Sequence, residues 1–113
     1  NGNMIKEFPI NFHRVFGKNI VFSGGGFFRL FPYWLIKKWG KEADYMCTYF
    51  HPRDFDKDQP MVQGLPLMRR FKSYVGISGN FEKWNRLLDD FEFITVGQAR
   101  EKRDWEKARV VEI

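Results

Sequence analysis

Three consecutive glycines interrupt an otherwise aromatic stretch, which reads Phe22-Ser23-Gly24-Gly25-Gly26-Phe27-Phe28-Arg29-Leu30-Phe31-Pro32-Tyr33-Trp34. Consecutive glycines permit backbone angles that other residues avoid, so they predict a sharp turn or a close approach of the backbone to another segment. Pro32 suits the first turn of a helix, which we expect over residues 33–39 with Gly40 as its end. The stretch therefore predicts a turn that leads into a helix.

Apolar residues on both sides of this stretch predict short strands. Residues 7–12 alternate between apolar and polar, residues 19–22 form a second extended piece, and residues 43–50 and 91–96 are dense in apolar, aromatic and β-branched side chains. Asn80 is predicted to cap a second helix, because apolar residues recur after it at three- and four-residue steps, at Phe81, Trp84, Leu87, Leu88 and Phe91. Short strands that alternate with two main helices predict an α/β fold.

Length and composition indicate one folding unit. The 113 residues are 43% hydrophobic, which is enough for a single core, so we expect residues 1–113 to form one unit. Residues 98–113 are heavily charged and predict a surface helix at the C-terminal end. No apolar run approaches the roughly 18 residues of a membrane span, so none is predicted, and the sequence does not indicate a compartment.

Charge and aromatic content bear on the kind of partner. The formal net charge of +5 suits an anionic partner, but the positive residues are scattered along the chain, which argues against a nucleic-acid binder. Aromatic residues make up 19% of the chain, including 13 Phe and 4 Trp, more than one core of this size needs. Exposed rings stack on sugars or bases, or pack against a partner domain, and composition leaves these three alternatives open.

His51 is the residue that carries the clearest chemical signal. It follows the apolar segment 43–50 and precedes Pro52, which restricts it to an extended conformation where the segment becomes a loop. Asp54 and Asp56 lie close by in sequence, and carboxylates can fix an imidazole tautomer and raise its pKa into the range of a general acid. One histidine with one aspartate supplies two metal ligands where a catalytic metal normally has three, so we expect no metal site within this chain.

Several segments, taken together in their order along the chain, resemble one protein family. They are residues 7–10, the glycine-aromatic stretch 22–34, the run Tyr49-Phe50-His51-Pro52-Arg53-Asp54-Phe55-Asp56, the pair Gln59-Pro60, and residues 70–75 and 87–91. Together they resemble the C-terminal region of bacterial polysaccharide deacetylases with a NodB-homology domain, of the branch linked to exopolysaccharide loci. The resemblance covers roughly residues 7–96.

The resemblance implies that this chain is the C-terminal part of a distorted (β/α) barrel. In that family a divalent metal such as zinc, held by one aspartate and two histidines, activates water to attack an N-acetyl group. Those ligands belong to N-terminal Asp-Asp and His-x-x-x-His motifs, which do not occur here, so the metal is expected in the full-length parent. Tyr49-Phe50-His51 corresponds to the family's Leu-x-His motif. By resemblance, His51 is the general acid that protonates the departing sugar amine.

The same comparison suggests substrate-binding residues and partners. We expect Tyr49, Arg29 and Trp34 to contact the polysaccharide, with an ion pair for Arg29 and core or interdomain packing for Trp34 as the structural alternatives. The expected partner is the N-terminal part of the same deacetylase domain, and the fragment alone is expected to be inactive and to self-associate through exposed strand edges. The alternative function is a noncatalytic module that binds glycans through surface aromatic residues.

Overall fold

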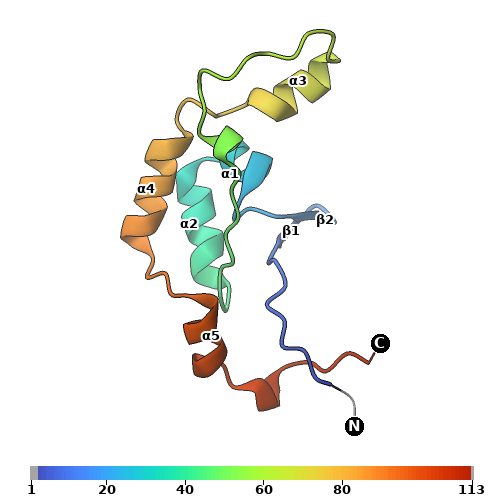
Figure 1. Cartoon of the computed structure of the whole chain (residues 1–113), viewed down its shortest axis with the longest axis vertical. Helices are drawn as coiled ribbons and strands as arrows, with labels where there is room; N and C mark the ends of the chain where they lie inside the picture. Colours follow the sequence, from blue (N-terminus) through green and yellow to red (C-terminus); the bar gives the residue numbers. More distant parts are fainter. Residues whose placement is uncertain (1–2, 113) are drawn as a thin grey trace.

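The computed structural model describes residues 3–112, which are mostly helical (Figure 1). Within these residues there are five α-helices, one β-hairpin and two 3₁₀ turns. Their bounds are β1 His13–Val15, β2 Lys18–Ile20, α1 Gly25–Leu30, α2 Tyr33–Glu42, η1 Pro52–Asp54, α3 Leu67–Tyr74, α4 Asn80–Asp90, α5 Val96–Lys102 and η2 Trp105–Lys107. The predicted alternation of strands with two helices is wrong for this part of the chain, and no barrel forms within it.

The glycine run makes the close backbone approach that the sequence predicts. Gly25 has a φ of 58°, in the left-handed region that favours glycine. Gly24 forms an isolated parallel bridge with Tyr49, and a Cβ on Gly24 would lie 2.1 Å from the Tyr49 carbonyl oxygen. A side chain at position 24 would therefore separate the turn from residues 49–51.

Helix α2 follows Pro32 as predicted but continues past Gly40 to Glu42. Gly40 lies within the helix and does not end it. Its lack of a side chain allows close packing, because a Cβ there would lie 2.9 Å from the ring of Phe91. The glycine lets the chain after α4 lie close against α2.

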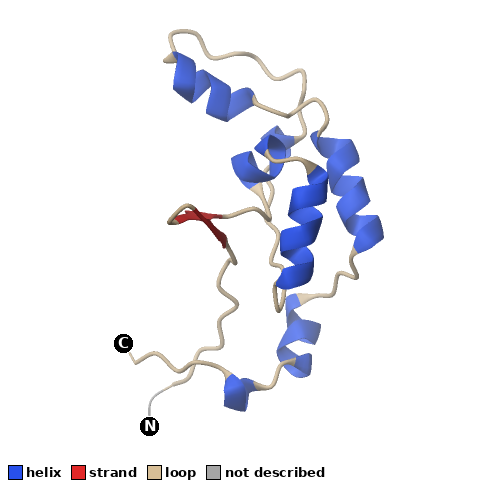
Figure 2. Cartoon of the chain, turned by 180° about the vertical axis from the view of Figure 1, so that it is seen from behind, coloured by secondary structure: helices blue, strands red, loops and turns tan. Residues whose placement is uncertain are grey.

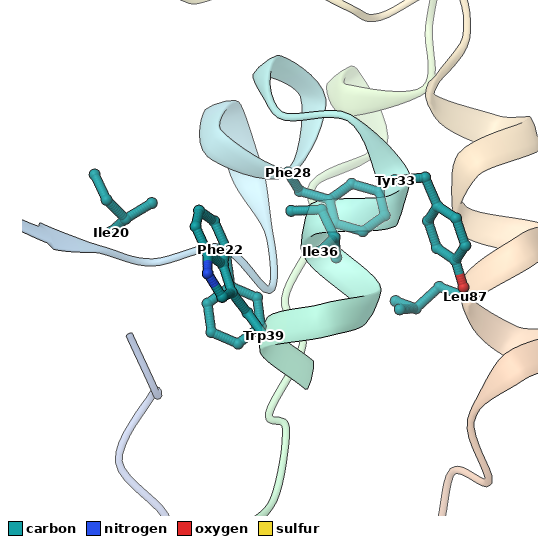
Figure 3. Close-up of a cluster of buried hydrophobic side chains, with 7 residues drawn as sticks. All are labelled: Ile20, Phe22, Phe28, Tyr33, Ile36, Trp39 and Leu87. Carbon is teal, nitrogen blue, oxygen red and sulfur yellow. The ribbon is translucent and has the colours of Figure 1, made fainter. Parts of the chain in front are cut away.

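The core lies between α1, α2 and α4 (Figure 3). Phe22, Phe28, Ile36 and Leu87 are essentially inaccessible to solvent. Helix α4 confirms the predicted amphipathic helix, and Leu87 is its most deeply buried apolar residue. Asn80 does not cap this helix, contrary to the prediction, because Gly79 takes that position and the Asn80 side chain donates to the Asp54 carbonyl. Fully burying each of these large apolar side chains contributes about 1.5–3 kcal/mol, so this cluster holds the three helices together.

The hairpin overlaps the strands predicted from the sequence only at residues 19 and 20. β1 and β2 pair antiparallel with His13 opposite Ile20 (Figure 2, red). Phe16 and Gly17 connect them with φ values of 47° and 76°, the two positive angles that a tight hairpin turn requires. Residues 7–12 are not a strand, and the second strand is Lys18–Ile20 in place of residues 19–22.

Residues 43–50 and 91–96 do not form the predicted strands. A strand needs a neighbouring backbone, and within residues 3–112 the only bridge to the first segment is that between Gly24 and Tyr49. At Tyr45 and Cys47 the side chain of Asn11 takes the place of a neighbouring strand. Asn11 Nδ2 donates to the Tyr45 carbonyl (2.9 Å), and Cys47 N–H donates to Asn11 Oδ1 (3.2 Å). The segment is thus held from one side without a ladder.

The predicted surface helix over residues 98–113 is confirmed only in part. Helix α5 starts earlier, at Val96, because Thr95 and Gln98 form a capping box, and it ends at Lys102. The ring of Trp105 then contacts Phe8, with 5.3 Å between the ring centroids. This contact brings the two ends of the chain to the same end of the molecule (Figure 1).

The described residues are less compact than one domain of this length. The radius of gyration is 16.8 Å, whereas a compact domain of this size has about 13 Å. The accessible surface is 9262 Å², against about 6,600 Å² expected for a folded monomer of this mass. No helix within residues 3–112 is long and apolar enough to cross a membrane. The surplus surface includes many large apolar side chains that the described residues leave exposed.

Candidate functional site

A cleft of about 270 Å³ lies beside His51. It is lined by residues of α1, of the segment that ends in η1, and of α3, namely Gly25, Gly26, Arg29, Tyr49, His51, Arg53, Asp54, Arg69, Lys72 and Ser73. Three of the four site residues predicted from sequence, His51, Tyr49 and Arg29, therefore line the same cleft. Trp34 does not line it and lies on α2 with 66% of its surface exposed.

His51 sits where the sequence places it, at the end of an extended segment. Its backbone angles are φ −103° and ψ 151°, the extended conformation that Pro52 imposes, and the residue is exposed. The edge of its ring faces Tyr49, with 6.0 Å between the ring centroids. Tyr49 is itself tied to the glycine turn through the bridge to Gly24. The imidazole is thus presented to the cleft from a fixed backbone.

Asp54 fixes the backbone of His51. Its Oδ2 accepts the His51 N–H at 2.9 Å, and its own N–H donates to the His51 carbonyl at 2.9 Å. The expectation that a carboxylate would hold the imidazole is wrong, because within residues 3–112 no carboxylate lies within 4.0 Å of its nitrogens. The Asp54 carbonyl accepts from the buried Asn80 side chain at 2.9 Å, which anchors η1 to α4.

Arg29 links the elements that line the cleft. Its Nε lies 3.2 Å from Asp54 Oδ1, and both side chains are about 95% buried, with 6% and 5% exposed. The Nε has no aligned hydrogen-bond acceptor, so this contact is one of charge. The terminal nitrogens donate to the carbonyls of Lys72, Ser73 and Val75, at the C-terminal end of α3. The structure thus shows the ion pair that was one of the alternatives for Arg29.

Burial and the neighbouring charges have opposing effects on the pKa of Arg29. Burial lowers the pKa of the Arg29 guanidinium, the Asp54 carboxylate opposes this effect, and the positive charge of Arg53 adds to it. Arg53 therefore lies close enough to Arg29 to repel it. Asp54 is the carboxylate that offsets this repulsion at Arg29.

Four residues that line the cleft were not predicted: Arg53, Arg69, Lys72 and Ser73. Three of them lie on α3, a helix that the sequence analysis did not identify. Its signal is the set of apolar residues spaced for one helical face after Pro66, at Leu67, Met68, Phe71 and Val75. All of them but Val75 are exposed, so the helix lies on the surface with little packing to define it.

A second, larger groove of about 460 Å³ lies between residues 43–48 and 91–96. Phe8, Gly40 and Ala99 complete its lining. Both walls are the segments whose composition predicts strands, and Phe93 and Ile94 on the second wall are 39% and 40% exposed. The groove is a place where further chain can be buried.

The residues of this chain do not fit a catalytic metal. Within residues 3–112 no three His, Cys, Asp or Glu side chains lie close enough to bind one ion together. Asp54, the carboxylate nearest to His51 in the cleft, already contacts Arg29. A metal that serves chemistry at His51 would need ligands from elsewhere.

A family model described as a domain of unknown function, DUF3473, matches residues 1–101. The match includes the cleft, the groove and most of α5. No curated protein and no solved structure matches the chain.

Proposed function

We propose, for a chain that belongs to the DUF3473 family, the role of the C-terminal part of a metal-dependent polysaccharide deacetylase. Its substrate class is a polymer of N-acetylated sugars, and its contribution is the general acid His51. The observation that supports this role is the setting of His51: an exposed imidazole on a cleft, carried by a backbone that the buried Asp54–Arg29 pair holds in place.

This setting suits a proton donor. Hydrolysis of an N-acetyl group breaks the bond between the carbonyl carbon and the sugar nitrogen, and water supplies the new carbon–oxygen bond. The departing amine is a poor leaving group until its nitrogen receives a proton. A protonated His51 donates that proton from the cleft and becomes neutral, and Tyr49 forms the wall beside it. The divalent metal that the resemblance implies would be held by another part of the protein, because residues 3–112 bring no three donor side chains together.

The surplus surface supports the N-terminal part of the same domain as the partner. The chain exposes about 2,700 Å² more than a compact monomer of its mass, comparable to a large intramolecular interface. The groove between residues 43–48 and 91–96 has walls with the composition of strands but no neighbouring strand within residues 3–112. In the proposed assembly these segments pair with strands of the N-terminal part and complete the distorted (β/α) barrel.

Replacing His51 in the full-length protein tests this function. We expect His51→Asn to lower the rate of acetate release from an N-acetylated oligosaccharide about 100-fold to 10,000-fold, because proton donation to the amine is lost. The matched control is His13→Asn, which changes the other histidine. His13 stacks on Trp39 at 4.7 Å and does not line the cleft, so its replacement should leave the rate within about threefold.

Equal activity of His51→Asn and the unmodified protein would contradict the assignment of His51. A full-length protein that binds N-acetylated oligosaccharides but releases no acetate would instead support the alternative, a noncatalytic glycan-binding module. The observation that favours this alternative is the exposure of Trp34, whose ring is available for stacking on a sugar. In that case Trp34→Ala should weaken binding, whereas His51→Asn should not.

A further inference from the structure

The cleft beside His51 carries an excess of positive charge. Four of its lining residues are cationic, Arg29, Arg53, Arg69 and Lys72, and one is a carboxylate, Asp54. This imbalance is local, because over the whole chain 19 Lys and Arg residues stand against 14 Asp and Glu residues. The scattered charge of the sequence thus becomes concentrated at one place in the fold.

Only one of these cations is neutralised. Arg29 is buried against Asp54, and the two cancel each other. Arg53, Arg69 and Lys72 are exposed, and within residues 3–112 none of them lies within 4.0 Å of a carboxylate oxygen. Three unneutralised cations therefore face the same cleft as His51.

The three cations lie on two elements, η1 and α3, that Arg29 links to each other. Arg53 belongs to η1, directly after His51 and Pro52. Arg69 and Lys72 are three residues apart on α3, so they project from the same side of that helix. The carbonyls at the end of α3 accept from Arg29, which also contacts Asp54 of η1. The Arg29–Asp54 pair thereby sets the distance between the two cations of α3 and Arg53 of η1.

The turn after α3 packs against the backbone of Arg29. Gly76 has a φ of 70°, and a Cβ at this position would lie 2.3 Å from the Arg29 carbonyl oxygen. Lys83, on α4, donates to the carbonyls of Phe28, Arg29 and Phe31 and so closes the end of α1. The backbone around Arg29 is therefore held from two sides. Like charges held close together in this way repel one another, and an anion bound among them removes that cost.

We propose that the cleft binds an acidic polysaccharide, with Arg53, Arg69 and Lys72 contacting carboxylate groups of the sugars that flank the one presented to His51. This inference rests on the proposed function and specifies its substrate class. Arginine contacts a carboxylate in a planar, two-bonded geometry, and the lysine adds a point charge. Sugar polymers offer these carboxylates as uronic acid units, which can alternate with N-acetylated units in one chain.

Two probes of similar length separate charge from the acetyl group. A hyaluronan hexasaccharide carries N-acetyl groups and carboxylates, whereas chitohexaose carries N-acetyl groups alone. With the full-length protein we expect tighter binding of the hyaluronan hexasaccharide by calorimetry, and about tenfold weaker binding of it when salt rises from about 0.05 M to about 0.5 M. Binding of chitohexaose should change little with salt.

Variants that each remove one positive charge test which residues bind the carboxylates of the hyaluronan hexasaccharide. Arg53→Gln, Arg69→Gln and Lys72→Gln should each raise the Kd for the hyaluronan hexasaccharide about 3-fold to 5-fold, and the triple variant about 30-fold or more. The Kd for chitohexaose should stay within about twofold. Arg100→Gln and Lys102→Gln, on α5 outside the cleft, remove equal charge and should leave both constants unchanged.

Each outcome bears on one hypothesis. Equal affinity for the two probes, or equal effects of the cleft and α5 variants, would overturn the acidic-polysaccharide assignment. Tighter binding of a single-stranded oligonucleotide than of the hyaluronan hexasaccharide, lost in the same cleft variants, would overturn it in favour of a nucleic acid. Absence of acetate release from both probes, with the charge-dependent binding intact, would count against the deacetylase and leave the acidic ligand in place.

Discussion

The half of the molecule built on α1, α2 and α4 differs from the half built on residues 43–48 and 91–112. The first half buries Phe22, Phe28, Ile36 and Leu87 almost completely. The second leaves Phe93, Ile94 and Val96 at 39%, 40% and 71% exposed around a groove. The first half therefore contains its own core, whereas the apolar residues around the groove of the second half stay exposed. The cleft at His51 adjoins the first half, because Gly25, Gly26 and Arg29 of α1 line it together with residues of η1 and α3.

The largest expected contrast between the halves comes from two phenylalanines. Phe28→Ala should lower the free energy of unfolding by about 3–5 kcal/mol, because it leaves a cavity among α1, α2 and Phe50. Phe93→Ala should lower it by less than about 1 kcal/mol in this chain, because the ring is 39% exposed. Urea denaturation followed by circular dichroism measures both values.

The contrast would disappear if Phe93→Ala destabilised the isolated chain as much as Phe28→Ala does. That result would mean that the groove is already closed, by the chain itself or by a second copy. If an N-terminal part covers Phe93 as proposed, the two substitutions should have comparable effects in the full-length protein.

Two ion pairs offer the next contrast. Asp54→Asn leaves the buried Arg29 guanidinium without its counter-charge and should cost about 3 kcal/mol of stability. The Lys38–Glu42 pair on α2 is exposed and separated by 4.0 Å, so Glu42→Gln should change stability by less than about 0.5 kcal/mol. The measurement is again urea denaturation. A small effect of Asp54→Asn would mean that water reaches Arg29 and that the cleft is less rigid than the contacts indicate.

Two tyrosines give the smallest contrast, one from each half. Burial, followed by a hydrogen bond to Asp90, raises the pKa of Tyr33 above its ordinary 10.0. The hydrogen bonds from Tyr33 and Lys37 lower the pKa of Asp90. A raised tyrosine pKa stabilises the fold below pH 10 and loses that contribution as pH rises further, whereas the lowered Asp90 pKa contributes above about pH 4 and is lost in acid.

Tyr33→Phe should therefore lower stability by about 1 kcal/mol at pH 7 and flatten its decline above pH 10. Tyr45→Phe, in the second half, should cost less than about 0.5 kcal/mol, since the Tyr45 hydroxyl donates to the Pro9 carbonyl in an exposed hydrogen bond. Thermal unfolding across a pH series measures both. Parallel pH curves for Tyr33→Phe and the unmodified chain would contradict the role given to the Tyr33–Asp90 contact.

Local signals in the sequence were sufficient for the elements that depend on neighbours in the chain. The periodic apolar residues predicted α4, Pro32 predicted the start of α2, and the glycines predicted a turn with a close backbone approach, though not Tyr49 as its partner. Pro52 likewise predicted the extended backbone of His51. These features follow from residues within a few positions of one another, so no knowledge of the tertiary structure was needed.

Features that depend on distant or absent neighbours were not predictable in the same way. The composition of residues 43–50 and 91–96 favours strands, but a strand also needs a second backbone, which residues 3–112 do not provide. The hairpin was not predicted, because its turn carries Phe16-Gly17, whereas such turns usually carry Asn or Asp before glycine. The cations of the cleft could be counted in the sequence, but only the fold brings α3 to η1.

The side chain of Asn11 has a consequence for how a sheet can grow on this chain. Its amide bonds the Tyr45 carbonyl and the Cys47 N–H, the two groups that one residue of a parallel strand would contact. Ser23 takes the Cys47 carbonyl, and Gly24 meets Tyr49 on the same side. Backbone groups alternate in direction along an extended segment, so those of Met46 point the other way. One edge of the segment is thus already bonded within the chain, so a strand that paired with the segment in the proposed assembly would have to join at the opposite edge.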